Sequence, residues 1–390
     1  MFYLLIATLL LLGALYHIYD KPNSNTETYI LFVLFVTIAG LAYETGVDWR
    51  LYKFSYENIN NLTDVISKKN FFATSGFIVE PGFAFLGSIS KSISREFQLL
   101  VLFVNVICAI FIFKHLRYYT FHYYLFFLLY LGYIYFTLNM SGIRQAIAVA
   151  IFIYSIKYIK ENRIKNYMLC CFTAALFHVS ALVTIPIYWI SKFRPQPVII
   201  WILIFSGCFI YVCQISLINS LILQFASIFD NPFIDKIVKY SLESEETQST
   251  VSPKIFLYIL LLVILLRRKK ILIQKNSYTE ILLNVYIFFL IMLEFLWDTG
   301  DVIERLRYYF IISLFILLPN LCFSFRRVSN RFLGMVFIYV LSLWSSNPIF
   351  FELKGGQSYN PYQNYLIYKL MDIESDGDNR LDKFINRDDG

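Results

Sequence analysis

The chain is dominated by long apolar runs that short polar segments separate. Many of these runs approach the 20 or so residues that a helix needs to cross the hydrocarbon core of a bilayer. Because a backbone in lipid must satisfy its own hydrogen bonds, such runs fold as membrane-spanning helices. Hydrophobic residues make up 58% of the sequence and leave no room for a separate soluble domain of normal size. The sequence therefore predicts an all-α polytopic membrane protein.

Measuring the apolar runs against this length predicts about 10 to 12 membrane-spanning helices. Single spans are predicted near residues 2–19, 28–43, 97–113, 119–138, 143–159, 167–190, 254–266, 279–297, 304–323 and 331–346. The stretch 197–229 is too long for one untilted span, and we interpret it as a tight hairpin of two short spans. The first run has no basic leader and no small-residue cleavage site, so it is interpreted as a retained span.

Basic residues cluster in short loops between these runs. The four clusters are Lys114 and Arg117; Lys157, Lys160, Arg163 and Lys165; Arg267, Arg268, Lys269, Lys270 and Lys275; and Arg326, Arg327 and Arg331. If the 197–229 hairpin exists, all four fall on one side, and short loops rich in Lys and Arg face the cytoplasm. The net charge of +7 is thus explained by membrane orientation and does not indicate nucleic-acid binding. Both chain termini are predicted to lie outside.

Three of the larger external segments are predicted, two within a single transmembrane domain that covers residues 1–346 and one after it. They are the long first loop 44–96, the acidic loop 230–253 and the C-terminal segment 347–390. The first loop holds a semi-apolar piece that Glu80-Pro81-Gly82 interrupts, which predicts an interfacial or re-entrant segment in place of a span. The C-terminal segment becomes charged after Asp372, and we expect it to be disordered at its end.

Arg144 opens the apolar run 143–159, directly after Ser141 and Gly142. A charge at the edge of a span is costly and usually functional, although the side chain could simply reach back to the surface. A guanidinium beside the free N–H groups of a helix start suits a phosphate or diphosphate. Gln145 adds a neutral donor and acceptor that suit a sugar hydroxyl. Arg144 is thus a candidate catalytic residue, and Gln145 a candidate substrate-binding residue.

Two carboxylates in the first external loop are candidates for acid–base chemistry. Asp48 is flanked by Trp49, Arg50 and Tyr52, a composition more typical of a sugar-binding or catalytic loop than of a linker. A solvated loop carboxylate is the alternative. Glu80 is the other carboxylate predicted to reach the membrane surface. We therefore take Asp48 and Glu80 as catalytic candidates, with Arg50 and Tyr52 as substrate-binding candidates.

A second pair of arginines opens the run 304–323. Arg305 and Arg307 follow an acidic turn that contains Asp301. The acidic residues of the turn could simply pair with them. Alternatively, Arg305 and Arg307 join Arg144 in a diphosphate clamp, because several cations can share one dianion. Asp301, Arg305 and Arg307 are therefore candidate substrate- or diphosphate-binding residues.

His178 is predicted to lie about halfway along the span 167–190. Its helix neighbours would be Ala174, Ala175 and Ala181, a small face that lets another helix approach closely. An interhelical hydrogen bond is one interpretation of this histidine. The other is a residue that lines a cavity below the outer surface, and on that basis His178 joins the catalytic candidates.

Other motifs point to no metal or cofactor. The six cysteines all lie in apolar stretches and show no metal-ligand spacing. The sequence has no phosphate-binding glycine loop, no G-x-S-x-G and no H-E-x-x-H. We therefore predict neither a metal nor a cofactor.

Several of these segments together resemble the EpsG family of polysaccharide polymerases, often grouped with the Wzy O-antigen and capsule polymerases. They are Gly46-Val47-Asp48, Glu80-Pro81-Gly82-Phe83, Ser141-Gly142-Ile143-Arg144-Gln145-Ala146, Phe177-His178-Val179-Ser180-Ala181-Leu182, Arg305 with Tyr308-Tyr309, and Pro361-Tyr362. The resemblance covers nearly the whole chain. Its most specific part is the Gly-Ile-Arg-Gln and Phe-His-x-Ser-Ala pair. Trp49-Arg50 departs from the smaller or tyrosine-rich residues usual after the first motif.

The resemblance implies a GT-C-like glycosyltransferase that transfers glycan between undecaprenyl-diphosphate carriers. The reaction would take place on the outer face of a bacterial inner membrane, with lipid-linked oligosaccharides as donor and acceptor and with a chain-length regulator as a possible partner. Arg144, with Arg305 and Arg307, would stabilise the leaving diphosphate without a metal, and Asp48 or Glu80 would remove the acceptor proton. The alternatives are a flippase for lipid-linked sugars and a membrane acyltransferase centred on His178.

Overall fold

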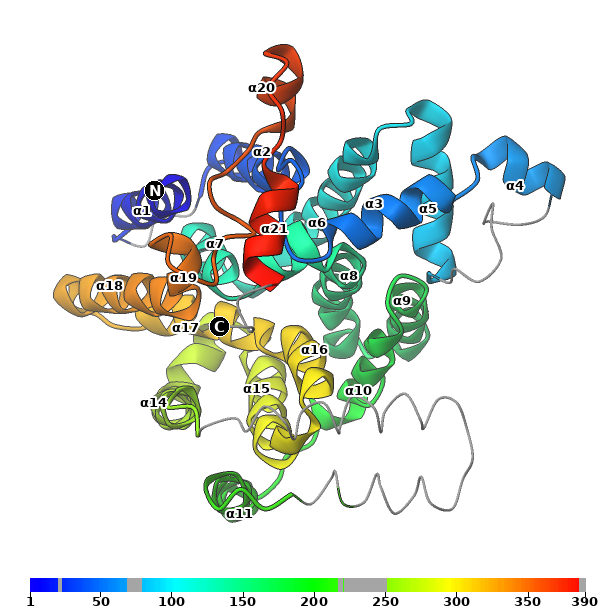
Figure 1. Ribbon diagram of the computed structural model, residues 1–390. Helices are drawn as coiled ribbons and strands as arrows, with labels where there is room; N and C mark the ends of the chain where they lie inside the picture. The colour runs from blue at the N-terminus through cyan, green and yellow to red at the C-terminus, as the bar shows by residue number, and fades with distance from the viewer. Residues whose placement is uncertain (20–22, 69–78, 217–219, 221–250, 386–390) are drawn as a thin grey trace. The chain divides into compact units, whose positions relative to one another are not determined.

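A computed structural model of the chain describes residues 1–19, 23–68, 79–216, 220 and 251–385 (Figure 1). Within these ranges the regular structure is helical, and the extended backbone includes an isolated bridge between Ala42 and Asn364. Three of the described helices are long and apolar enough to cross a membrane: Phe97–Tyr119, Tyr123–Ser141 and Val328–Ser345. Shorter apolar helices accompany them. The prediction of an all-α membrane protein is thus confirmed.

The chain divides into two compact units, one formed by Met1–Leu182 with Leu318–Gly390 and the other by Val183–Leu317. The helices of the first unit are α1 (Phe2–Tyr16), α2 (Asn25–Gly40), α3 (Trp49–Asn58), α4 (Leu62–Lys68), α5 (Pro81–Ile93), α6 (Phe97–Tyr119), α7 (Tyr123–Tyr130), the π-helix η1 (Leu131–Ser141), α8 (Ile143–Lys160), α9 (Ile164–Ala175), α18 (Val328–Ser345), α19 (Asn347–Phe350), α20 (Tyr365–Leu370) and α21 (Gly377–Ile385). Those of the second are α10 (Ile187–Ile190), α11 (Pro197–Val212), α14 (Lys254–Lys275), α15 (Thr279–Phe295), η3 (Trp297–Thr299) and α16 (Asp301–Phe310). The chain passes between the units within η2 (Val179–Thr184) and α17 (Ile312–Cys322).

The run predicted as one span at 167–190 is not one helix. It forms α9, η2 and α10. The amide of Ser180 donates to His178 Nδ1 at 3.3 Å, and the carbonyl of Leu176 accepts from the amide of Gly82 at 2.8 Å. Both groups are therefore diverted from helical hydrogen bonds, and the helix stops where these contacts form.

A second predicted span, 304–323, is divided between α16 and α17. The amide of Ile311, at the junction, still donates to the carbonyl of Arg307, but α17 begins anew at Ile312. Of the predicted hairpin 197–229, the structure describes α11 and little more. Its second half, and most of the acidic loop 230–253, lie outside the described residues.

A buried polar network fixes the π-helix η1 inside the first unit. Asn139 Nδ2 donates to Asn105 Oδ1 of α6 at 2.9 Å, and the hydroxyl of Tyr130 donates to Asn139 Oδ1 at 3.0 Å. All three side chains are fully buried. Polar groups inside a membrane bundle need such partners, and π-helical turns recur at functional sites. The network therefore positions the end of η1, where Ser141 lies.

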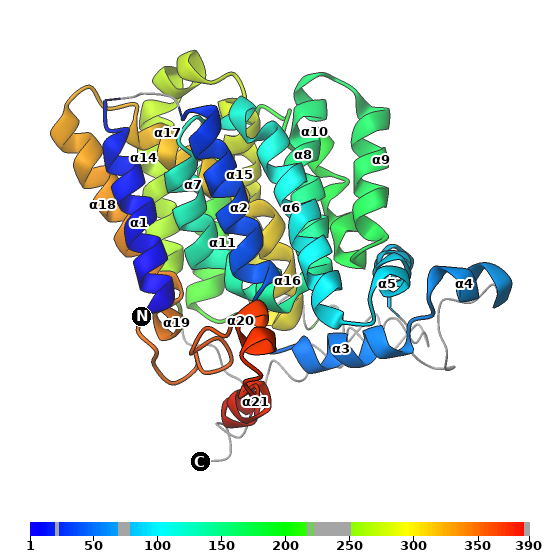
Figure 2. The same cartoon turned by 90° about the horizontal axis from the view of Figure 1, so that it is seen from above.

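Helix α8 carries basic residues at both of its ends. Arg144 lies in its first turn, while Lys157 and Lys160 lie in its last. The 18 residues of α8 span about 27 Å at 1.5 Å per residue, close to the thickness of a bilayer core. Within this unit, α3, α20 and α21 gather at one end of the longer helices (Figure 2).

The charged part of the C-terminal segment contains a helix, α21, and the structure is described as far as Ile385. Disorder was expected at the end of the segment, and residues 386–390 lie outside the described residues. Helix α21 is amphipathic and buries Gly377, Arg380 and Leu381. Composition predicted disorder because charged residues bury little apolar surface. Helix α21 is held by hydrogen bonds from Arg380 to the backbone carbonyls of Tyr43 and Glu44, far away in the sequence.

Candidate functional site

Three predicted residues meet at the start of α8, each from a different segment of the first unit. Arg144 Nη1 donates to Glu80 Oε2 at 2.5 Å, and Arg144 Nε donates to the hydroxyl of Tyr52 at 3.2 Å. The guanidinium carbon also lies 5.3 Å from the centre of the Tyr52 ring. The side chains of Arg144 and Glu80 are 23% and 18% exposed, so the pair is shielded but reachable. The arginine is thus held by a carboxylate, a hydroxyl and an aromatic face.

Local sequence explains how Glu80 reaches this position. Pro81 occupies the first turn of α5, where its fixed φ angle suits a helix start and its missing N–H costs nothing. The amide of Gly82 donates to the carbonyl of Leu176, and a Cβ atom on Gly82 would lie only 2.8 Å from that oxygen. Only glycine permits this approach. Glu80-Pro81-Gly82 is therefore anchored on the end of α9.

Ser141 holds the loop that carries Asp48. Its Oγ atom accepts hydrogen bonds from the amides of Val47 at 3.1 Å and Asp48 at 3.2 Å, and it donates to Asp48 Oδ2 at 3.3 Å. Gly46 has φ of 99°, and a Cβ atom there would lie 2.5 Å from the carbonyl oxygen of Met140. The loop can lie on the end of η1 because position 46 is glycine.

The two candidate carboxylates have different surroundings. Glu80 makes a short contact with a guanidinium, whereas Asp48 Oδ2 accepts a longer bond of 3.3 Å from the neutral hydroxyl of Ser141. Burial raises the pKa of the neighbouring Tyr52, so that phenol stays protonated and acts as a neutral partner for Arg144. An ion-paired carboxylate suits positioning, and a more lightly held one suits proton transfer.

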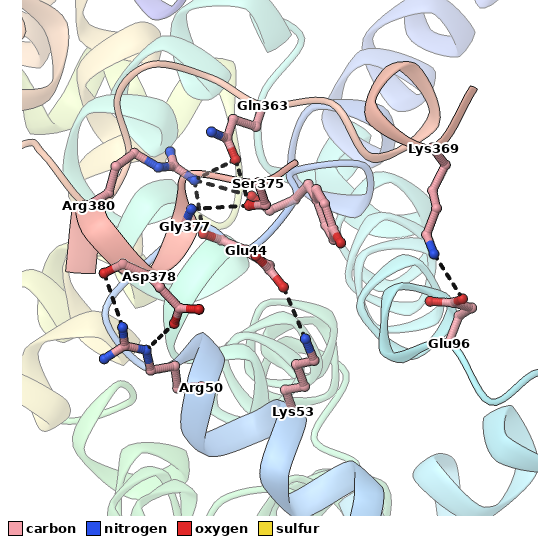
Figure 3. A network of polar contacts seen from close by, with 11 residues as sticks. Glu44, Arg50, Lys53, Glu96, Gln363, Lys369, Ser375, Gly377, Asp378 and Arg380 are labelled. Carbon is pink, nitrogen blue, oxygen red and sulfur yellow. Dashed lines mark hydrogen bonds and ion pairs between the residues drawn. The ribbon is translucent and has the colours of Figure 1, made fainter. Parts of the chain in front are cut away.

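Arg50 was predicted to bind substrate, but it is engaged by the C-terminal helix (Figure 3). Arg50 Nε donates to Asp378 Oδ1 at 2.6 Å, and Nη1 donates to Asp382 Oδ1 at 2.7 Å. These bonds raise the pKa of Arg50 and lower that of Asp382. The side chain of Arg50 therefore ties α3 to α21 and does not join the group around Arg144.

Gln145 and His178 also differ in their placement. Gln145 follows Arg144 on α8 and is buried, 5% exposed. His178 does not lie in the middle of a span but at the break after α9, with Nδ1 2.6 Å from Ser180 Oγ. The segment that carries His178 is linked to the site through Leu176, two residues before His178. The carbonyl of Leu176 accepts a hydrogen bond from the amide of Gly82, two residues after Glu80.

The remaining predicted residues lie on α16 in the second unit. Arg305 Nη2 is 3.7 Å from Asp301 Oδ2, and Arg307 pairs with Glu304. Both pairs form within one helix, as the more conservative interpretation of the sequence expected. A shared clamp with Arg144 stays a prediction.

Two residues of this region were not assigned from the sequence. Ser141 stood inside a recognised motif, but only its position at the end of η1 gives it a role. Arg380 lies in a tail expected to be disordered and is 3% exposed, and no sequence signal marks it. Among the described residues, no three His, Cys, Asp or Glu side chains gather closely enough to hold a metal ion.

These observations define a polytopic, all-helical membrane protein with an arginine–carboxylate site at the helix ends of one unit. The model of the EpsG family matches residues 27–364, and the chain belongs to this family. Asp48, Tyr52, Glu80, Arg144 and His178 all lie within the match, whereas α20 and α21 follow it. Membership gives the chain a polysaccharide polymerase-like role. No curated protein and no solved structure matches the chain.

Proposed function

We propose that the protein joins undecaprenyl-diphosphate-linked oligosaccharide repeat units into an O-antigen, capsular or other extracellular polysaccharide, as a GT-C-like glycosyltransferase. The observation that carries this proposal is the convergence of Arg144, Glu80 and Tyr52 beside the Asp48 loop, in a chain of the EpsG family. A diphosphate leaving group requires a fixed cation, and an acceptor hydroxyl requires a base. The site offers both within one unit.

The proposed reaction is a single inverting displacement. The acceptor hydroxyl of one lipid-linked unit attacks the anomeric carbon of the growing chain, a new glycosidic C–O bond forms, and the bond to the lipid diphosphate breaks. Asp48 takes the hydroxyl proton, since its carboxylate is the more lightly held of the two. The electron pair of the broken bond goes to the diphosphate, and Arg144 stabilises the charge that develops there.

Glu80 and Tyr52 position Arg144 in this scheme. A guanidinium carries five N–H donors, more than the contacts to Glu80 and Tyr52 use. Held in place by its partners, Arg144 meets the diphosphate without first losing side-chain freedom. Arg305 and Arg307 are proposed as additional cations for the same diphosphate, and Gln145 as a partner of a sugar hydroxyl.

We place the reaction on the external face of the bacterial inner membrane. Support comes from α8, which carries Arg144 in its first turn and basic residues in its last. Since short basic loops stay in the cytoplasm, the opposite end of this helix faces outward. Sugar donors on that face are lipid-linked, which agrees with a site built for diphosphate.

The test is an incubation of the purified protein with one defined lipid-linked repeat unit, with the products resolved by size. A ladder of products spaced by one repeat unit is expected. A product that gains an acyl mass would indicate an acyltransferase instead. Unchanged substrate, together with movement of the lipid across a vesicle membrane, would indicate a flippase.

A further inference from the structure

The loop that carries Asp48 lies between η1 and the C-terminal helix α21. Ser141 and Met140 contact it on the η1 side. On the other side, a Cβ atom on Gly377 would lie 2.5 Å from Glu44 Cβ, so the start of α21 rests directly on this loop. Glu44 has φ of 45°, a region that residues with side chains rarely adopt. Such a conformation persists only where surrounding contacts hold it.

Arg380 of α21 supplies the central contact. Its Nη2 donates to the carbonyl of Glu44 at 3.0 Å, to the carbonyl of Tyr43 at 3.3 Å and to Gln363 Oε1 at 3.1 Å. Its Nη1 donates to the carbonyl of Pro361 at 2.8 Å. A guanidinium is costly to bury unless its donors find partners. Here the partners come from both the loop and the C-terminal segment, so one buried side chain joins the two.

A second contact lies on the other side of Asp48. Arg50 binds Asp378 and Asp382, also on α21. Glu44 and Arg50 therefore anchor the loop on the same helix, one before Asp48 and one after it (Figure 3). Arg380, Asp378 and Asp382 all follow residue 364, where the family match ends. Helix α21 thus lies outside the matched residues.

We propose that α21 is a positioning element for the Asp48 loop, with Arg380 as its principal positioning residue. Through the carbonyls of Tyr43 and Glu44, Arg380 fixes the backbone that aims Asp48 at the acceptor hydroxyl. Arg380 itself touches no substrate. The effect of Arg380 on the reaction rests on the proposed function, whereas its effect on the conformation of the Asp48 loop does not.

Holding of the loop can be measured without any activity. Thr45 is 3% exposed, so Thr45→Cys in a cysteine-free background should resist a thiol reagent. Adding Arg380→Ala should speed labelling by about tenfold or more, because a released loop opens locally. Lys383→Ala, an exposed position on the same helix, is the matched control and should change nothing. Equal labelling rates with Arg380→Ala and Lys383→Ala would overturn the proposal.

The kinetic test separates positioning from binding. Arg380→Ala should lower kcat for polymer formation roughly 10- to 100-fold, the scale of a small misplacement of a reacting group. KM should stay near that of the unmodified protein, because Arg144 still meets the diphosphate. Arg380→Lys should recover part of the rate, since an ammonium can serve some of the same carbonyls. An unchanged kcat, or a change in KM alone, contradicts a positioning role.

A second variant guards against misfolding of Arg380→Ala. Gly377→Ala retains the Arg380 side chain but places a methyl group against the Cβ atom and the carbonyl oxygen of Glu44, so it should also speed Thr45→Cys labelling and lower kcat. If the unmodified protein makes no polymer, the proposed function fails. The labelling rates then still decide whether α21 holds the loop.

Discussion

Arg144 and Glu80 form a partly shielded ion pair, and the two candidate carboxylates differ because only one of them belongs to it. Glu80 receives a charged donor, and Asp48 receives a neutral one. Two carboxylates in unlike surroundings generally divide the chemical work between them. We therefore expect Asp48 to accept the proton of the acceptor hydroxyl and Glu80 to hold Arg144 in position.

Asp48→Asn and Glu80→Gln separate these two roles. Asp48→Asn keeps size and polarity but cannot accept a proton, so polymer formation should fall by roughly 10²-fold or more with little change in substrate binding. Glu80→Gln should leave Arg144 less firmly oriented, so it should raise KM in addition to lowering the rate of polymer formation. The measurement is the initial rate of ladder formation beside a binding isotherm, at matched protein. An active Asp48→Asn with an inactive Glu80→Gln would move the base to Glu80, and two active variants would leave neither as an essential base.

The sequence could identify site residues that have a local sequence signal, but not contacts between residues far apart along the chain. Arg144 stands out because it is charged at the start of an apolar run, and Glu80 because proline and glycine follow it. Arg50 was assigned to substrate because it lies beside Asp48 in the sequence. Its ion pairs with α21 could not be predicted, because the partners lie 328 and 332 positions away in a segment with no apolar pattern. Substrate binding by Arg50 stays a prediction.

At the scale of elements, the site depends on places where helices end or change their form. The π-helix η1 ends at Ser141, α9 ends before His178, and α5 begins after Glu80. Apolar runs predicted most helices, since their length and hydropathy are local properties. They could not predict the break after α9, because the partner of the Leu176 carbonyl is the amide of Gly82, from a distant segment. The amphipathic helices α3 and α21 were missed for a similar reason, as neither is apolar enough to resemble a span.

Gly46→Ala tests the contact between the Asp48 loop and η1. The variant adds backbone strain of about 1–3 kcal/mol and also drives a methyl group into the carbonyl of Met140. Gly355→Ala is the matched control, since Gly355 has a similar φ of 97°. We expect Gly46→Ala to lower both thermal stability and polymer rate clearly more than Gly355→Ala does. Equal effects in the two variants would show that strain alone matters.

At the scale of the whole molecule, the basic clusters predict one orientation in the membrane. Single cysteines in a cysteine-free background can be labelled with an impermeant thiol reagent in intact spheroplasts. Positions 160, 270 and 326 should be protected, and positions 47 and 301 should react. All five side chains are exposed in the structure, so protection reports sidedness. Labelling at 270, or protection at 301, would contradict the predicted topology and the external site.

The central claim is that Arg144 stabilises a departing lipid diphosphate during polymer growth. The most direct measurement is the initial rate of ladder formation from one defined lipid-linked repeat unit, for the unmodified protein, Arg144→Lys and Arg144→Ala at equal amounts in the membrane. The account predicts a ladder from the unmodified protein, a rate lowered by roughly 10²-fold or more for Arg144→Lys, and no polymer from Arg144→Ala, because lysine offers only a point charge. Near-normal polymer from Arg144→Ala would contradict it.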